Sequence, residues 1–226
     1  LDSRLYVRDQ LIEVRRKLID SVHSLLEKSK ENLNRVMVGY THVQHAQPIT
    51  VAYWLSHYAS AFLRDLTRFK RAYDQTDRNP LGAGALAGSS FNIDRNLTSD
   101  LLGFQSLDVH GLDATSARDF ALEVLSSNAI LETTASRLAE EFILWSSYEF
   151  QTLTLDDGFA MGSSMMPQKK NPGALELLRG RSGRVNGLLT AGLTMLKGLP
   201  SGYNRDFHEE KEIVFESLRL TNMMVK

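Results

Sequence analysis

The chain has 226 residues, of which 42% are hydrophobic, and its 26 basic and 27 acidic residues give a formal net charge of −1. This length and apolar content suffice for one sizeable core or two modest domains. Because the charges balance, we expect no general polyanion-binding surface and no nucleic-acid partner. The absence of cysteine excludes disulfides, thiolate metal sites and a cysteine nucleophile, and it fits a cytoplasmic location.

Hydrophobicity along the chain gives no sign of a membrane segment. No apolar run approaches the roughly 20 residues that cross a bilayer. The stretch from Leu1 to Lys17 is charged and amphipathic, unlike a signal peptide. We therefore expect no membrane partner.

Helical spacing of apolar residues dominates the chain from its start. A first helix is predicted from Asp2 to about Arg35, with a seam of Leu11, Leu18 and Leu25 and a neighbouring row of Ile12, Ile19 and Leu26. A second helix is predicted after Pro48, and its apolar stripe consists of Val51, Leu55, Tyr58, Phe62, Leu66 and Phe69.

Three further helices are predicted in the second half of the chain. One runs from about Ser116 to Phe150, roughly 50 Å at 1.5 Å per residue. Another begins at Asn171, an N-cap, with Pro172 as its first residue and Leu189 on its apolar face. The last covers about 205–226. No stretch alternates with period two, so we predict no strands and one all-α domain, a bundle of long helices.

Three irregular segments connect these helices, at residues 39–48, 79–94 and 156–172. Loops more unusual than a connection requires often carry function. In the last segment, Lys169 and Lys170 stand just before a helix N-terminus, where exposed amides and the helix dipole favour an anion. A solvated polar loop is the plain alternative.

This last segment resembles a known signature. Gly162-Ser163-Ser164-Met165-Met166-Pro167-Gln168-Lys169-Lys170-Asn171-Pro172 is similar to the loop Gly-Ser-Ser-x-Met-Pro-x-Lys-x-Asn-Pro of the fumarase, aspartase and argininosuccinate lyase superfamily. Within that superfamily, the triplet at 168–170 looks like the argininosuccinate lyases. Residues 39–48 independently resemble the family's Gly-Tyr-Thr-His-x-Gln-x-Ala-Gln-Pro motif, in which His45 occupies a variable place. Residues 79–88 look like its glycine-rich turn, and 197–206 like its substrate-binding stretch.

The resemblance implies a β-elimination that converts argininosuccinate to arginine and fumarate in arginine biosynthesis. It implies a central long-helix bundle domain over 1–226 that contributes to a homotetrameric helical core with shared active sites. It implies no metal and no organic cofactor, and the sequence holds no nucleotide-binding fingerprint. The alternatives are another superfamily lyase, most plausibly adenylosuccinate lyase, and a catalytically inactive structural homologue like the lens delta-crystallins.

The matching motifs also imply catalytic roles. Ser163 takes the place of the catalytic base, and Lys169 that of the lysine that stabilises the negatively charged intermediate. His42 matches the histidine of the acid-side chemistry, and Glu176 matches the acid that pairs with it. A plain reading leaves Lys169 solvated and Glu176 an ordinary acid of a helix's first turn.

Other positions match substrate-binding residues of the family; they are Thr41, Asn171, Arg118, Tyr203, His208 and Lys211. A plain reading makes Arg118 an ion-pair partner. Two positions depart from the pattern, because His208 stands where glutamine is usual and Gly173 where many members have aspartate. The family's first signature, a Ser-Arg-Asn stretch, would lie just before Leu1. We therefore expect the small N- and C-terminal domains to be missing, and the chain alone to lack a complete site.

Overall fold

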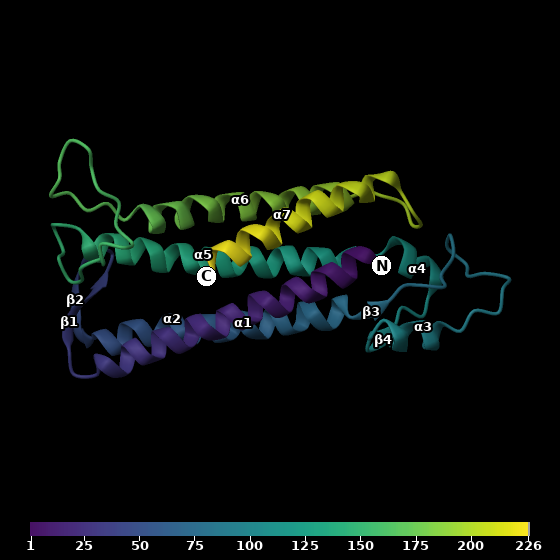
Figure 1. Cartoon of the computed structure of the whole chain (residues 1–226), viewed down its shortest axis with the longest axis horizontal. Coiled ribbons are helices and arrows are strands. Elements are labelled where there is room, and N and C mark those ends of the chain that lie inside the picture. Colours follow the sequence, from purple (N-terminus) through teal and green to yellow (C-terminus); the bar gives the residue numbers. More distant parts are fainter. Residues whose placement is uncertain (226) are drawn as a thin grey trace.

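Long helices make up most of the chain, of which the computed structural model describes residues 1–225. Consecutive long helices run in opposite directions along one elongated bundle (Figure 1). They are α1 (Asp2–Glu31), α2 (Val51–Thr76), α5 (Asp119–Ser146), α6 (Gly173–Leu196) and α7 (Glu209–Met224). The prediction of a bundle of long helices is confirmed.

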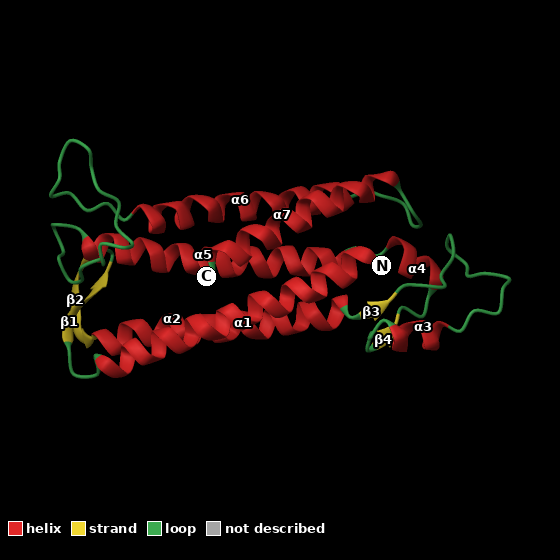
Figure 2. Cartoon of the chain, in the orientation of Figure 1, coloured by secondary structure: helices red, strands yellow, loops and turns green. Residues whose placement is uncertain are grey.

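Shorter elements gather at the two ends of the bundle (Figure 2). At one end, β1 (Val36–Thr41) and β2 (Gln44–Thr50) form an antiparallel hairpin. The other end holds β3 (Arg78–Asn79), α3 (Arg95–Leu101), β4 (Ser106–Leu107), α4 (Gly111–Ser116) and the 3-10 helix η1 (Arg205–His208). There β3 and β4 pair in parallel. Each end therefore combines segments that are far apart in the sequence.

The expectation that the chain has no strands is wrong at the hairpin. Its two strands pair from Val36 with Thr50 to Thr41 with Gln44. No alternation of apolar and polar residues marks either strand, because β2 has no buried residue and β1 buries only Met37 and Gly39. The apolar side chains that pack on the bundle, Met37, Tyr40 and Ile49, do not alternate regularly with polar ones along the strands.

Helix boundaries differ from the predicted ones for local reasons. Helix α1 ends before Arg35, because the chain turns there into β1. The helix predicted over Ser116–Phe150 is interrupted by the extended backbone of Ala117, which separates α4 from α5, and α5 stops short of its predicted end. Pro172 is the N-cap of α6 rather than its first residue. The last predicted helix begins as η1, and its predicted end, Lys226, lies outside the described residues.

One apolar core runs along the bundle where α1, α2, α5 and α7 meet. Its fully buried side chains include Val7, Leu11, Leu18, Phe69, Val124, Leu131 and Leu218. Burying a side chain of this size stabilises the fold by about 1.5–3 kcal/mol. A smaller cluster around Trp54 and Trp145 packs against Met37 of β1 and holds the hairpin on the end of the bundle.

Helices α1 and α6 are among those that keep large apolar side chains on the outside of the bundle. On α1, Ile12 and Ile19 are each 52% exposed, although they adjoin the buried seam. Helix α6 buries only Gly173, Ser182, Val185 and Gly192. Its Leu177 and Leu193 are more than half exposed. The bundle therefore presents apolar surface along both helices.

Candidate active site

Thr41 and His42 lie at the tip of the β1–β2 hairpin. His42 and Val43 form its two-residue loop, with φ angles of +57° and +58°. Positive φ at both positions is typical of a type I′ turn, which normally selects glycine or asparagine. The left-handed conformation costs a residue with a Cβ about 1–2 kcal/mol. Such strain clusters at functional sites, which fits the role expected of His42.

A cavity of about 510 Å³ lies beneath this hairpin, between α2 and α5. Most of its wall is apolar or aromatic, from residues such as Met37, Tyr40, Ile49, Tyr53, Trp54, Leu144 and Trp145. His42, His57 and Glu141 also line it. The indole Nε1 of Trp54 donates to Glu141 Oε2 at 2.5 Å, which ties α2 to α5 below the hairpin.

The serine-rich segment that resembles the signature loop is closed at its base. Met161 and Asn171 form an antiparallel bridge, in which each backbone N–H donates to the other's carbonyl oxygen at 2.8 Å. A Cβ on Gly173 would overlap the Sδ of Met161. Gly173, which stands where many family members have aspartate, therefore has a packing reason. Its missing side chain leaves the space that Met161 occupies.

Ser163 and Lys169 lie within this closed loop. The backbone N–H of Met166 donates to Ser163 Oγ at 3.2 Å, so a local turn orients the hydroxyl. The side chain of Lys169 lines a cavity of about 550 Å³ together with Glu176, which stands in the first turn of α6. Ser163 does not line this cavity.

The two adjacent lysines of the loop have different electrostatic surroundings. Lys170 pairs with Asp157, and the hydrogen bond from this carboxylate raises the pKa of Lys170. Lys169 forms no ion pair within the described part of the chain. Its ammonium group is therefore the one of the pair that is available to an anionic ligand.

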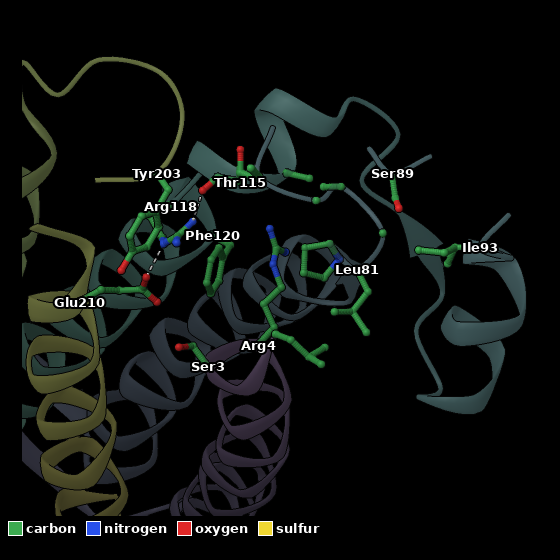
Figure 3. A pocket seen from close by; sticks show the side chains of 17 residues that line it. Ser3, Arg4, Leu81, Ser89, Ile93, Thr115, Arg118, Phe120, Tyr203 and Glu210 are labelled. Atoms are coloured by element: carbon green, nitrogen blue, oxygen red, sulfur yellow. Dashed lines mark hydrogen bonds and ion pairs between the residues drawn. The ribbon is translucent and has the colours of Figure 1, made fainter. Parts of the chain in front are cut away.

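Arg118 and Tyr203 lie at the opposite end of the bundle, in the wall of a cavity of about 740 Å³ (Figure 3). Arg118 is the N-cap of α5, and Tyr203 belongs to the connection between α6 and η1. The glycine-rich turn supplies another part of the wall, including Gly84 and Ser89. Gly84 has a φ of +62°, and a Cβ there would overlap the carbonyl oxygen of Gly88. The turn therefore requires glycine at this position.

The guanidinium of Arg118 is held by four contacts. Its Nε lies 2.5 Å from Glu210 Oε2, and its Cζ lies 4.3 Å above the ring of Phe207. Its Nη1 donates to the carbonyl oxygens of Ala117 at 2.7 Å and Thr115 at 3.4 Å. Burial raises the pKa of Glu210, and the nearby Arg118 partly offsets this. Glu210 Oε1 is buried without a hydrogen-bond partner in the described chain. The pair thus leaves one acceptor oxygen at the cavity wall.

Arg4 lines the same cavity and is only 5% exposed. Its Nη2 lies 3.0 Å from Asp108 Oδ2, and its Cζ lies 4.2 Å above the ring of Phe120. Asp108 also accepts a hydrogen bond from Arg78 Nε at 2.6 Å. One carboxylate therefore connects the start of α1 to β3 and to the segment after β4, and this fixes the shape of the cavity.

His208 and Lys211 are placed beside the cavity rather than in its wall. Tyr203 Oη lies 2.6 Å from His208 Nε2, so the imidazole contacts the hydroxyl of a cavity residue. Lys211 is exposed in the first turn of α7. Of these three predicted substrate residues, the structure brings only Tyr203 into the cavity.

The predicted site residues thus form two groups at opposite ends of α5. Arg118 precedes its first turn and Trp145 lies in its last, a separation of about 40 Å at 1.5 Å per residue. The β1–β2 hairpin, which holds His42, and the connection between α5 and α6, which holds Ser163, lie towards the same end of the bundle (Figure 1). None of the three cavities described above contains both residues. One copy of the chain therefore does not bring all of its predicted site residues into one cavity.

Sequence reasoning missed Glu210, Arg4 and Asp108. Glu210 stands in a charged run that is typical of an exposed helix start. However, it also lies four residues before Val214 and eight before Leu218, both buried. An acid on an apolar stripe is the signal that could have identified it.

Within residues 1–225, no group of three or more histidine or acidic side chains is arranged to hold a metal ion. None of the helices there combines the length and apolar character needed to cross a membrane.

Comparison with known proteins adds to this geometry. Residues 1–187 match the protein family described as Lyase. The chain belongs to this lyase family. It is 48% identical over 218 residues to an argininosuccinate lyase of Desulforamulus reducens, and 49% identical over 217 residues to one of Oceanobacillus iheyensis. Each alignment covers 96% of this chain and 47% of the relative. This member of the lyase family thus spans about half the length of the curated relatives it matches.

Solved structures show the same architecture. An EDDS lyase in complex with formate superposes with a TM-score of 0.88 at 33% identity, over 98% of this chain and 46% of that one. A class II fumarase from Schistosoma mansoni superposes with a TM-score of 0.83 at 20% identity, over 98% and 52%. The fumarase shows the fold alone. The predicted membership of the superfamily is confirmed for this lyase-family chain.

Proposed function

We propose that residues 1–226 form the central helical-bundle catalytic domain of an argininosuccinate lyase. The reaction eliminates fumarate from argininosuccinate and leaves arginine, as a cytoplasmic step of arginine biosynthesis. The observation that carries this proposal is the identity of 45–50% with argininosuccinate lyases over nearly the whole chain. The chemistry of the two groups of site residues supports it.

The first step removes a proton from the carbon beside a substrate carboxylate, and we assign it to Ser163. A serine hydroxyl is a poor base in water, so its alkoxide must be stabilised by nearby donors and cations. The N–H of Met166 donates to Ser163 Oγ, which favours the alkoxide. The unpaired ammonium of Lys169, in the same loop, stabilises the charge that develops on the substrate.

The second step releases the guanidinium nitrogen, which needs a proton. His42 supplies it from the exposed hairpin tip, and Glu176 pairs with this imidazole. In one chain these two residues line different cavities. The pairing therefore joins His42 of one copy to Glu176 of another. Thr41 and Asn171 hold the substrate beside them.

The remaining substrate residues, Arg118, Tyr203, His208 and Lys211, form the carboxylate-binding group at the other end of α5. About 40 Å of helix separates this group from Ser163, far more than one substrate spans. We therefore propose a homotetramer in which each active site combines residues of several copies. The exposed apolar side chains of α1 and α6 support self-association, since large exposed apolar patches mark interfaces.

Parallel assays of the whole protein on argininosuccinate, adenylosuccinate and EDDS test this proposal. EDDS is included because an EDDS lyase is a structural relative of this chain. We expect fumarate release from argininosuccinate alone, and its loss in Ser163→Ala and His42→Asn with an unchanged elution volume on a sizing column. Turnover of adenylosuccinate alone would make the protein a different lyase. An intact oligomer that turns over none of the three would favour a structural homologue.

A further inference from the structure

Tyr203 lines the cavity, and its hydroxyl also contacts the imidazole of His208. Tyr203 Oη lies 2.6 Å from His208 Nε2, and the two rings meet nearly edge to face at 68° with centroids 6.3 Å apart. Tyr203 lines the cavity near Arg118, as Figure 3 shows, and His208 does not contribute to the wall. The imidazole therefore reaches a ligand in this cavity through Tyr203.

The protonation of Nε2 decides what Tyr203 offers to that ligand. A phenol hydroxyl has one hydrogen to donate and lone pairs with which to accept. If Nε2 carries no proton, Tyr203 donates to it, and its oxygen can only accept from the ligand. If Nε2 carries a proton, the imidazole donates to Tyr203, and the O–H is free. An ionised carboxylate only accepts hydrogen bonds, so it matches the second arrangement alone.

We propose that His208 is a positioning residue that sets the direction of the Tyr203 hydrogen bond, so that Tyr203 binds a substrate carboxylate most tightly when the imidazole is protonated. This inference rests on the proposed function, which makes the cavity a carboxylate site. Histidine changes charge between about pH 5 and 8. The charged imidazole makes a hydrogen bond about twice as strong as the neutral form. A neutral ring with its proton on Nε2 keeps the direction, so binding weakens at high pH without being lost.

None of the charged residues on the elements at this end of the bundle forms an ion pair with His208 in the described chain. They are Arg205, Asp206, Glu209, Glu210, Lys211 and Glu212 on η1 and α7, Lys197 at the end of α6, Arg118 and Asp119 at the start of α5, and Asp2 and Arg4 at the start of α1. Of these residues, Arg118 and Glu210 pair with each other. The hydroxyl of Tyr203 is therefore the direct partner of the imidazole.

The test measures KM and kcat of the whole protein for argininosuccinate from pH 6 to 8.5. In the wild type, we expect KM to rise up to about tenfold with pH, because a stronger hydrogen bond is worth about one factor of ten. The change in KM should exceed that in kcat. His208→Gln has an amide that donates to Tyr203 at every pH, so its KM should stay flat. Tyr203→Phe should raise KM and also flatten its profile.

His23→Gln is the matched control, because His23 is exposed on α1 and its side chain is remote from the cavity wall. It should keep the wild-type rise in KM. The same rise in His208→Gln would overturn the inference. Calorimetric binding of fumarate at pH 6 and 8 gives a readout without turnover, and we expect weaker binding at pH 8 in the wild type alone. Equal affinities would overturn the role of His208, whereas absent turnover would count against the proposed function instead.

Discussion

Arg118 and Trp145 stand about 40 Å apart at the two ends of α5, and each belongs to a different cavity. Tyr203, which we propose to bind a substrate carboxylate, lies near Arg118, whereas the hairpin with His42 packs over Trp145. If several copies share each active site, both ends of every α5 contribute to catalysis, but in different sites.

Two variants that are each inactive should therefore restore activity when they share a tetramer. Arg118→Ala damages one end of the bundle and Ser163→Ala the other. In tetramers assembled at random from equal amounts, about one quarter of the sites combine an intact Arg118 with an intact Ser163. We expect about one quarter of the wild-type rate of fumarate release after the two variants are unfolded and refolded together.

A mixture of Ser163→Ala and Lys169→Ala is the control. Both residues lie in the same loop of one copy, so no mixed tetramer contains a loop with both residues intact. This mixture should stay inactive. If mixed tetramers of the Arg118 and Ser163 variants form and show no recovery, the sharing of sites is refuted.

Glu132 should make the fold less stable as pH rises. It is fully buried in α5, neither of its oxygens has a hydrogen-bond partner among residues 1–225, and loss of solvation raises its pKa from 4.5 to about 8. Between these values the folded chain keeps a proton that the unfolded chain has lost, so the free energy of unfolding falls with rising pH. Glu132→Met removes this penalty, which approaches about 5 kcal/mol above pH 8.

Urea unfolding at pH 5 and pH 9 measures this effect. The gain in stability of Glu132→Met over the wild type should be several kcal/mol larger at pH 9 than at pH 5. Glu149→Gln, which changes an exposed acid, should show no such difference. A gain that is the same at both pH values would contradict a neutral buried Glu132.

Val43→Gly should stabilise the protein. Val43 has a φ of +58° and is 60% exposed, so glycine relieves the left-handed strain and gives up little packing. We expect the free energy of unfolding to rise by about 1 kcal/mol, the lower limit of the strain of one residue. Val36→Gly is the matched control, because Val36 is an exposed residue of the same hairpin with strand geometry. It should lower stability, and a similar loss in Val43→Gly would argue against strain at the tip.

Glu210→Gln should destabilise the protein by leaving a partly buried guanidinium without its acid. Glu210 is 4% exposed and pairs with Arg118, whose side chain is 18% exposed. Breaking a buried pair by removing one partner costs about 3 kcal/mol or more. Glu209→Gln changes the exposed neighbour and should alter stability by less than about 0.5 kcal/mol. Similar thermal melting of both variants would show that the pair adds nothing to stability.

The long helices could be predicted because each has a continuous apolar stripe. On α2 and α5, the stripes that end at Phe69 and Trp145 face the core and the hairpin cluster. The hairpin could not be predicted, since its strands are mostly exposed and its turn contains His42 and Val43 instead of asparagine and glycine. The short α4 was not predicted, because the expected helix began only at its last residue, Ser116, and Ala117 and Arg118 separate α4 from α5.

Residues that belong to a sequence motif could be predicted as site residues. Residues that meet from distant parts of the sequence could not. The motifs indicated Arg118 and Tyr203, which do share one cavity. Nothing local indicated that Glu210 would pair with Arg118, because 92 residues separate them in the sequence. The same holds for Arg4 and Asp108, whose hydrogen bond spans 104 residues. These residues become partners only through tertiary packing, so no local sequence pattern indicates the pairs.

The length of α5 has a consequence for how such a protein evolves. One inserted residue would turn everything beyond it by about 100° and advance it by about 1.5 Å, so both the core stripe and one half of the site would lose their alignment. Insertions and deletions should therefore accumulate in the connections at the two ends, such as the segment between α5 and α6. The helix itself should diversify only by substitution, and its number of residues should stay fixed across lineages.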